Sequence, residues 1–321
     1  MPHSAAFTRP ALSASAGFAS ALVAGVLALS LLSLALSRLE GGIALVWLSN
    51  GFAVGLLVWL RHAPPAWLWL ALGAALVVPR LLADEPLLRA ALVSAFNLAE
   101  IALVVYGVRR YGRPLSEPAA LLGNAGLAAA FSSAASLFTA VATSLGLGLI
   151  DQRPLGAWST ATAIFSAHLL GLVITAGLVA FAIGQRGRLF GRRGGRASFV
   201  LTWSALLGVL LLVLAQSTYP LLFLPFLPLA WMSFRHGVSG AVVGVLSIGV
   251  ASGAASILQL GPFQLVGETH AFAHRLLPQV YVLAACMLAL PLGLMMAERR
   301  RLLRSLRSSE SQYRLLAEHT R

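Results

Sequence analysis

Residues 277–301 read LPQVYVLAACMLALPLGLMMAERRR, an apolar stretch that ends in three consecutive arginines. An uninterrupted apolar run of this kind is long enough to cross the hydrocarbon core of a bilayer as an α-helix. Residues 302–321, LLRSLRSSESQYRLLAEHTR, continue with helix-forming residues and a high density of charge. The two stretches together predict a membrane-spanning helix that runs directly into a charged cytoplasmic helix.

The composition of the whole chain indicates a membrane protein. Of its 321 residues, 59% are hydrophobic and 10% are charged, and the mean hydropathy is +0.86. A soluble domain carries about a quarter charged residues. We therefore predict an all-α, polytopic bundle of transmembrane helices. The single cysteine, Cys286, excludes a disulfide within the chain and a cysteine metal site.

Ten apolar segments are long enough to be considered as spans, although the third and eighth are short. They cover residues 16–37, 42–60, 66–83, 88–108, 119–149, 157–184, 198–218, 220–235, 238–259 and 277–297. These segments define an integral membrane domain over residues 16–297, preceded by a short cytoplasmic segment, residues 1–15. Residues 298–312 form a cytoplasmic linker helix, and residues 313–321 are expected to begin a further domain.

The arginines predict the orientation of this domain. If the N-terminus is cytoplasmic and the ten spans alternate, 18 of the 23 basic residues fall on the inner side and five on the outer side. This is the asymmetry of the positive-inside rule. Both termini are therefore expected in the cytoplasm, with the domain in the inner membrane of a bacterium. The net charge of +13 is spread over segment ends, which argues against binding of nucleic acid.

Glu100 is the one acidic residue deep inside a predicted span, and Asn97 precedes it by three residues on the same helix face. A carboxylate in hydrocarbon must be neutralised, paired or next to water. Two interpretations follow. Glu100 belongs to a ligand or proton site, or it makes an interhelical hydrogen bond that fixes packing.

Asn50 lies in the middle of another span, within the sequence Trp47-Leu-Ser-Asn-Gly51. A Ser-Asn-Gly sequence at that depth suggests a break in the helix that lines a polar cavity. The alternative is close helix packing through Gly51 and Gly55.

His168 also lies in the middle of a span. A membrane histidine can relay protons, and it can equally form a hydrogen bond to a neighbouring helix. His270 and His274 are spaced i, i+4 in a predicted loop, with Glu268 nearby as a third ligand, so they are weak candidates for a zinc site. No catalytic motif is present, and no residue pattern indicates a cofactor.

The C-terminal helix carries a heptad pattern. Leu302, Leu306, Ser309, Tyr313 and Leu316 recur at spacings of 4, 3, 4 and 3. Such a seam predicts a parallel coiled coil between two copies of the chain, which can pass a shift or rotation to an attached domain. The alternative is an arginine-rich amphipathic helix on the membrane surface.

Several blocks of sequence resemble the membrane-associated sensor domains of bacterial signalling proteins, of the first MASE type. These blocks are residues 47–51 (WLSNG), 97–100 (NLAE) followed by Arg109 and Arg110, 168–171 (HLLG), 228–237 (PLAWMSFRHG) and 298–301 (ERRR). The blocks depart from the family pattern at Leu48, where proline is expected, and at His168, where aspartate is expected. Residues 311–321 look like the opening helix of a PAS domain.

This resemblance implies a sensory input module that precedes a histidine kinase or a diguanylate cyclase. Within the matching blocks it adds Trp47, Trp231 and Arg235 to the ligand-binding or signalling candidates Glu100, Asn97, Asn50 and His168. Expected partners are membrane lipid, a second copy of the chain, an output domain in cis and, as a further option, another membrane protein.

Two other classes of function are compatible with ten spans and intramembrane Glu, Asn and His residues. A secondary transporter or channel is one, although the internal repeat common in transporters is not visible between the two halves. An integral membrane enzyme is the other, and the sequence offers no clustered acid, base or metal ligands in its favour.

Overall fold

In the computed structural model, the described residues are 12–39, 46–60, 62–113, 120–151, 158–179, 183, 193–266 and 271–319. Their regular elements are helices, and one isolated β-bridge joins Leu12 to Leu60. The elements are α1 (Ala16–Leu39), α2 (Leu48–Leu57), α3 (Ala66–Leu82), α4 (Leu87–Tyr111), α5 (Ala120–Ile150), α6 (Trp158–Gly171), the π-helix η1 (Leu172–Ala176), α8 (Arg193–Leu214), α9 (Phe226–His236), α10 (Val238–Ile257), the 3₁₀-helix η2 (Pro262–Val266) and α11 (Ala271–His319).

The all-α bundle expected from the sequence is confirmed, and each of the ten predicted segments contains a helix. Within the described residues, seven helices are long and apolar enough to cross a membrane. The other three, α2, α3 and α9, have 10, 17 and 11 residues. A full crossing needs about 20 residues. The third and eighth segments, α3 and α9, are short as expected, whereas α2 is shorter than the span expected over residues 42–60.

Helix α2 is short because both of its ends are bound by groups from other helices. At its start, the backbone N–H of Trp47 donates to the carbonyl of Ala167 in α6. At its end, the guanidinium of Arg109 donates to the carbonyls of Leu57 and Leu60. A cation at a helix C-terminus satisfies carbonyls that have no partner within the helix. Asn50 therefore lies in a ten-residue helix whose two ends are held by hydrogen bonds to other helices.

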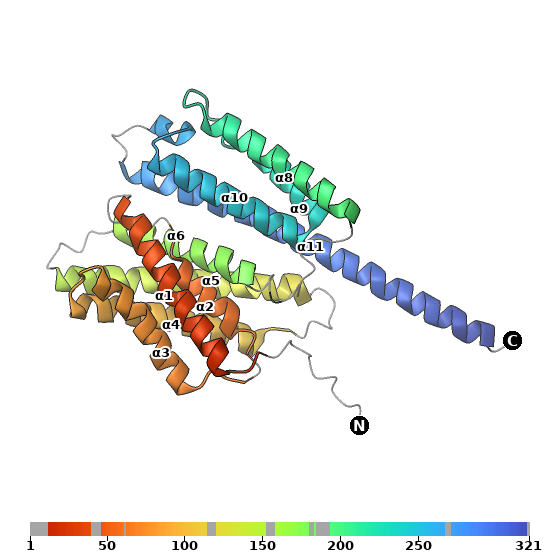
Figure 1. Cartoon of the computed structure of the whole chain (residues 1–321), viewed down its shortest axis with the longest axis horizontal. Helices are drawn as coiled ribbons and strands as arrows, with labels where there is room; N and C mark the ends of the chain where they lie inside the picture. Colours follow the sequence, from red (N-terminus) through yellow and green to blue (C-terminus); the bar gives the residue numbers. More distant parts are fainter. Residues whose placement is uncertain are drawn as a thin grey trace.

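The helices form two packed groups (Figure 1). One hydrophobic core is built mainly from α1, α2, α3 and α4. A second is built mainly from α8, α9, α10 and α11. Helix α6 and η1 contribute to both, since Leu170 belongs to the second core and Leu172 to the first. A movement of α6 would therefore change the packing in both hydrophobic cores.

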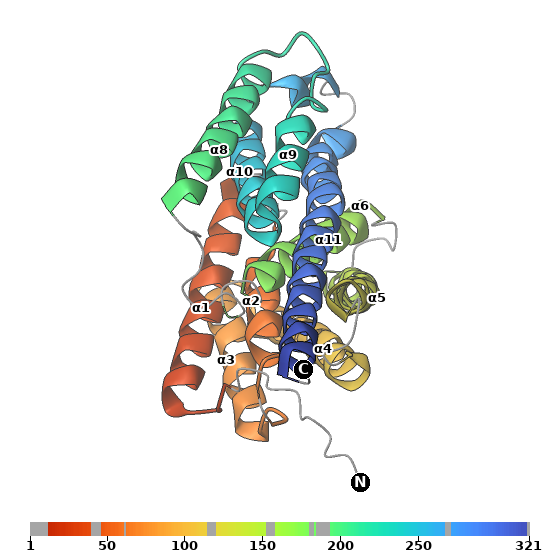
Figure 2. The same cartoon turned by 90° about the vertical axis from the view of Figure 1, so that its right-hand side faces the viewer.

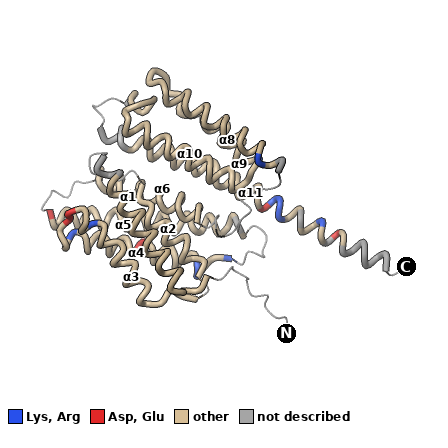
Figure 3. The backbone as a smooth tube through the Cα atoms, viewed as in Figure 1, with Lys and Arg blue, Asp and Glu red and all other residues tan. Residues whose placement is uncertain are grey.

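Helix α11 extends well beyond the bundle at its C-terminal end (Figure 1). It begins beside the other helices and continues without a break from Ala271 to His319. Within the bundle it packs against α6, as well as α5, α9 and α10 (Figure 2). Charged residues gather on this projecting part and at the opposite end of the bundle (Figure 3).

Candidate functional site

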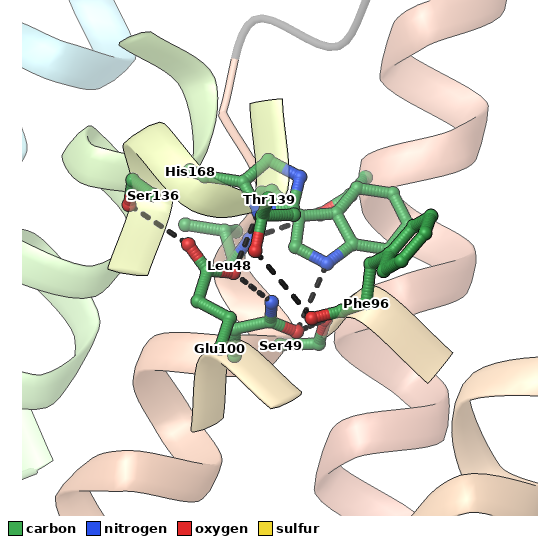
Figure 4. Close-up of polar contacts among 10 residues, drawn as sticks. Leu48, Ser49, Phe96, Glu100, Ser136, Thr139 and His168 are labelled. Carbon is green, nitrogen blue, oxygen red and sulfur yellow. Dashed lines mark hydrogen bonds and ion pairs between the residues drawn. The ribbon is translucent and has the colours of Figure 1, made fainter. Parts of the chain in front are cut away.

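Glu100 lies near the middle of α4 and is completely buried. Its carboxylate is in contact with three other helices (Figure 4). Oε1 accepts a hydrogen bond from Ser136 Oγ of α5 at 2.8 Å. Oε2 accepts one from Asn50 Nδ2 of α2, and it lies 2.7 Å from Nδ1 of His168 in α6. Buried polar groups are costly unless they are paired, and here both carboxylate oxygens have partners.

The orientation of the Asn50 amide is fixed by Trp47. The indole Nε1 of Trp47 can only donate a hydrogen bond, and it lies 3.1 Å from Asn50 Oδ1. The amide oxygen must therefore face the indole, which turns the amide NH₂ toward Glu100. Ser49 Oγ also donates to Oδ1, at 3.4 Å. Asn50 thus presents a fixed donor to the carboxylate.

His168 is the second ionisable group of the site. Its ring stacks on the indole of Trp47, with centroids 5.8 Å apart and planes 7° from parallel. Its Nδ1 can donate to the Glu100 carboxylate, or it can accept from a protonated Glu100, depending on where the proton resides. Two titratable groups in hydrogen-bonding contact can hold one proton or two. The arrangement can therefore bind and release a proton inside the bundle.

Close backbone packing brings these helices together. A Cβ on Gly51 would overlap the carbonyl oxygen of Gly171, and one on Gly55 would overlap the side chain of Val179. The backbone N–H of Leu48 donates to the hydroxyl oxygen of Ser33 in α1, at 3.2 Å. The Ser-Asn-Gly sequence lies within the continuous helix α2, so the structure does not show the helix break that was one interpretation. The close packing at Gly51 and Gly55 agrees with the alternative, and Asn50 joins a polar cluster.

The helix that carries His168 changes geometry directly after it. Helix α6 ends at Gly171, and the next five residues, Leu172–Ala176, form a π-helix. Within it, the hydroxyl of Thr175 donates to the carbonyl of Gly171. Single π-helical turns are rare and occur frequently at functional sites. The irregular turn supports a functional role for the cluster next to it.

Arg80 extends the cluster on the side of Trp47. Its guanidinium lies 4.9 Å from the centroid of the Trp47 ring. The same guanidinium donates to both carboxylate oxygens of Glu85, at 3.1 Å each. Arg80 is 8% exposed although it is charged, which is unusual unless the charge is paired. An arginine–carboxylate pair thus lies on the ring that stacks against His168.

The structure separates the remaining ligand-binding candidates from this cluster. Asn97 is fully buried one helical turn before Glu100, but within the described part of the chain its amide has no hydrogen-bond partner. Trp231 is 46% exposed on α9 and belongs to a different group of helices. Arg235 lies in the last turn of α9, where its Nε donates to Ser198 Oγ of α8 and its carbonyl accepts from Arg300 of α11.

The predicted signalling helix is part of α11. Leu302 and Leu306 lie on its projecting part and are 42% and 66% exposed. Tyr313 and Leu316 are in the same helix, but their side chains lie outside the described residues. His274 is in the first turns of α11, and His270 falls outside the described part. Among the described residues, no group of three potential metal ligands occurs.

Sequence reasoning missed Ser136, Arg80 and the contact between Ser166 and Gln279. Ser136 belongs to a series of buried hydroxyl residues on α5, with Ser132, Thr139 and Thr143 at helical spacing. That spacing is a readable signal for a polar helix face. Arg80 could also have been found from the sequence, because an arginine inside an apolar helix is expected to pair with an acidic group. Nothing local in the sequence connects Ser166 to a residue 113 positions away.

Comparison of the chain with known protein families identifies the family to which it belongs. The chain matches the MASE1 family over residues 17–300. It belongs to the MASE1 family. No curated protein and no solved structure matches the chain. MASE1 domains are membrane-associated sensor domains, so the chain carries a multi-pass sensory membrane domain.

Three of the sequence blocks that resembled this family meet at the cluster. Residues 47–51 supply Trp47 and Asn50, residues 97–100 supply Glu100, and residues 168–171 supply His168. Residues 228–237 and 298–301 meet elsewhere, through the hydrogen bond from Arg300 to the carbonyl of Arg235. The MASE1 domain thus has one polar centre among α2, α4, α5 and α6, and a second contact region where α11 leaves the bundle.

Proposed function

We propose that the cluster of Glu100, His168, Asn50 and Trp47 registers the stimulus and that α11 passes the resulting movement to an output domain. The observation that carries this proposal is the buried contact between Glu100 and His168. It joins two ionisable side chains of different helices at 2.7 Å inside a sensory membrane domain. A change of charge or of ligation there alters the attraction between α4 and α6.

A direct contact links α6 to the exit helix. Two residues before His168, the hydroxyl of Ser166 donates to Oε1 of Gln279 in α11. Gln279 is 3% exposed, so this contact lies in the interior. From Gln279 the helix continues unbroken to the projecting part of α11. A shift of α6 toward or away from α4 would thus be transmitted to α11 at its buried end.

A second contact positions α11 where it leaves the bundle. Arg300 donates to the carbonyl of Arg235, the penultimate residue of α9. Two turns deeper, a Cβ on Gly293 would lie 3.0 Å from the carbonyl oxygen of Gly237. The helix therefore rests closely on the α9–α10 corner. A displacement that begins at Gln279 would turn or slide α11 against this corner.

The output is proposed from the family resemblance and from the arginine distribution. The bacterial inner membrane, with both termini cytoplasmic, would place the projecting part of α11 in the cytoplasm. A histidine kinase or a diguanylate cyclase in cis would then receive the movement. The heptad positions of two chains would form a parallel coiled coil, which is an effective connection between membrane and cytoplasmic domains.

Spin labels on the projecting part of α11 test this proposal. The protein is reconstituted in nanodiscs with a label on a cysteine at the exposed Ser305, in a Cys286→Ala background. Glu100→Gln keeps the shape of the side chain and removes its ability to ionise. We expect Glu100→Gln to change the mobility spectrum of the label, and Gln279→Leu to abolish that change because the hydrogen bond to Ser166 of α6 is lost.

Ser252→Ala serves as the control. It removes a buried hydroxyl of α10 that has no partner among the described groups, so the label spectrum should match that of the parent. If Glu100→Gln leaves the label spectrum and the output of the full protein unchanged while the variant folds normally, Glu100 has no part in signalling and the proposal fails.

A further inference from the structure

The outward side of α9 is apolar along its length and cationic at its end. It exposes the large apolar side chains of Leu227, Trp231 and Phe234. Arg235 follows in the last turn and is exposed as well. These four residues share one side of the helix, because residues three and four positions apart lie above one another. Met232, on the opposite side, is fully buried. We call Leu227, Trp231, Phe234 and Arg235 the α9 face.

The length of α9 matches one layer of lipid. Its 11 residues make a helix about 16 Å long, and the hydrocarbon core of a bilayer is about 30 Å thick. Helix α9 packs between α8 and α11 and against α10, and these three helices are long enough to cross the whole membrane (Figure 2). The α9 face is therefore about as long as the acyl part of one leaflet, with its cation at one end.

The cationic end of the α9 face is held at a defined position. The Nε of Arg235 donates to Ser198 Oγ of α8, and the carbonyl of Arg235 accepts from Arg300 of α11. The next residue, His236, packs its ring edge-on against Phe199 of α8, with centroids 5.0 Å apart. The guanidinium of Arg235 thus lies where α8, α9 and α11 meet.

This guanidinium retains hydrogen-bond donors. In the part of the chain that the structure describes, the terminal nitrogens of Arg235 make no hydrogen bond and no ion pair. Arginine has five N–H groups in a planar fork, which binds two oxygens of a phosphate at once. Glu298, two residues before Arg300, is buried and lies 3.7 Å from Arg301. A phosphate can therefore bind Arg235 without displacing a carboxylate from it.

We propose that the α9 face binds one anionic phospholipid, with its phosphate on Arg235 and an acyl chain along the three apolar side chains. A soluble phosphate compound would use the arginine and leave the apolar residues without a role. A phospholipid uses both, and a net negative headgroup is attracted by the cationic corner more than a zwitterionic one. In the orientation proposed above, this lipid belongs to the cytoplasmic leaflet.

The inference goes beyond the proposed function, since it requires neither Glu100 nor an output domain. It gives a role to Trp231 and Arg235, which lie outside the polar cluster among α2, α4, α5 and α6. The bound headgroup lies beside the carbonyl that accepts the hydrogen bond from Arg300. The lipid composition thus acts on the corner against which α11 leaves the bundle.

Photo-crosslinking with lipid probes tests this site. The protein is reconstituted in phosphatidylcholine nanodiscs that contain a trace of phosphatidylglycerol or phosphatidylcholine with a diazirine on one acyl chain, and labelled peptides are mapped by mass spectrometry. We expect the phosphatidylglycerol probe to label α9 about fivefold more than the phosphatidylcholine probe. Arg235→Gln should abolish this preference. Arg235→Lys, which keeps the charge and loses the planar fork, should retain part of it.

Arg299→Gln is the matched control. Arg299 is exposed at the same end of the bundle, but it precedes Arg300 by one residue and so lies on a different side of α11. Its substitution removes the same charge and should leave the preference intact. An equal loss in Arg235→Gln and Arg299→Gln would show a general attraction to a cationic surface, and the site would be refuted.

Two further results would overturn the proposal. An excess of inorganic phosphate should not compete with the phosphatidylglycerol probe, because it lacks the acyl chain. Displacement of the probe by phosphate would assign Arg235 to a soluble phosphate compound instead of a lipid. The absence of labelling on α9 with both probes would show that protein, such as a second copy of the chain, covers the α9 face.

Discussion

Gly171 lies so close to Trp47 that a Cβ at position 171 would overlap the carbonyl oxygen of Trp47. The obstacle is backbone rather than a flexible side chain, so it cannot move aside cheaply. The same contact region holds the hydrogen bond from Trp47 N–H to the carbonyl of Ala167 and the stacking of Trp47 on His168. The position of the site therefore depends on the absence of a side chain at residue 171.

Gly171→Ala should separate α2 from α6 and destabilise the domain. Overpacking of a closely packed interior costs about 1–3 kcal/mol. Thermal unfolding of the purified protein measures this cost, and Gly177→Ala is the matched control. Gly177 lies six residues further along, and a Cβ added there would have no atom within 4 Å. Alanine at 177 should be neutral or stabilising, by about 0.5–1 kcal/mol, because glycine is unfavourable in a helix. Equal melting temperatures for both variants would contradict this account.

Trp47→Phe should loosen the site while keeping much of its packing. Phenylalanine retains a ring that can stack on His168, but it lacks the N–H group that fixes the amide of Asn50. Loss of one intramolecular hydrogen bond costs about 1 kcal/mol. Trp47→Leu removes the ring as well and should cost more. Melting temperatures of the two variants measure the difference, and an identical loss in both would show that the stacked ring contributes nothing beyond the indole N–H.

The sequence predicted the members of the polar cluster better than their relationship. Polar residues are rare inside apolar spans, so the local sequence alone was enough to single out Glu100, Asn50 and His168. The sequence did not show that their side chains meet, since Asn50 and His168 are 50 and 68 positions away from Glu100 in the chain. Their meeting depends on the packing of Gly51 against Gly171, which a pattern of single helices does not specify.

Helix lengths show a similar limit. The apolar run at residues 42–60 predicted one continuous span, because hydropathy alone records which residues avoid water. The helix within it covers only Leu48–Leu57, where tertiary hydrogen bonds from Arg109 and to Ala167 occupy the ends. The long helices α4, α5 and α10 were placed within a few residues of their observed bounds, since their own apolar length determines them.

Asn50→Asp should make the domain depend on pH. The substituted carboxylate would face Oε2 of Glu100, the acceptor of the Asn50 amide. Two adjacent carboxylates repel unless they share a proton. The folded state would then bind more protons than the unfolded state, so stability should rise as the pH falls and decrease as the pH rises. Melting temperatures recorded from acidic to neutral pH test this, with the parent as control. A pH dependence identical to that of the parent would show that the two side chains are not in contact.

Leu306→Cys should form a disulfide between two copies of the chain. Leu306 is 66% exposed on the projecting part of α11 and occupies a position of the predicted heptad seam. In a parallel coiled coil, equivalent seam positions of the two helices face each other. Oxidation of membranes that contain the variant in a Cys286→Ala background should therefore yield a covalent dimer on a non-reducing gel.

Ser308→Cys provides the matched control for this cross-link. Ser308 is also exposed, but it lies two residues further along and so on the opposite side of the helix. We expect it to cross-link much less than Leu306→Cys, because its equivalents point away from each other. If both positions cross-link equally, the copies meet only by collision. If neither does, α11 does not pair through this seam, and an arginine-rich helix lying on the membrane surface becomes the better description of residues 302–319.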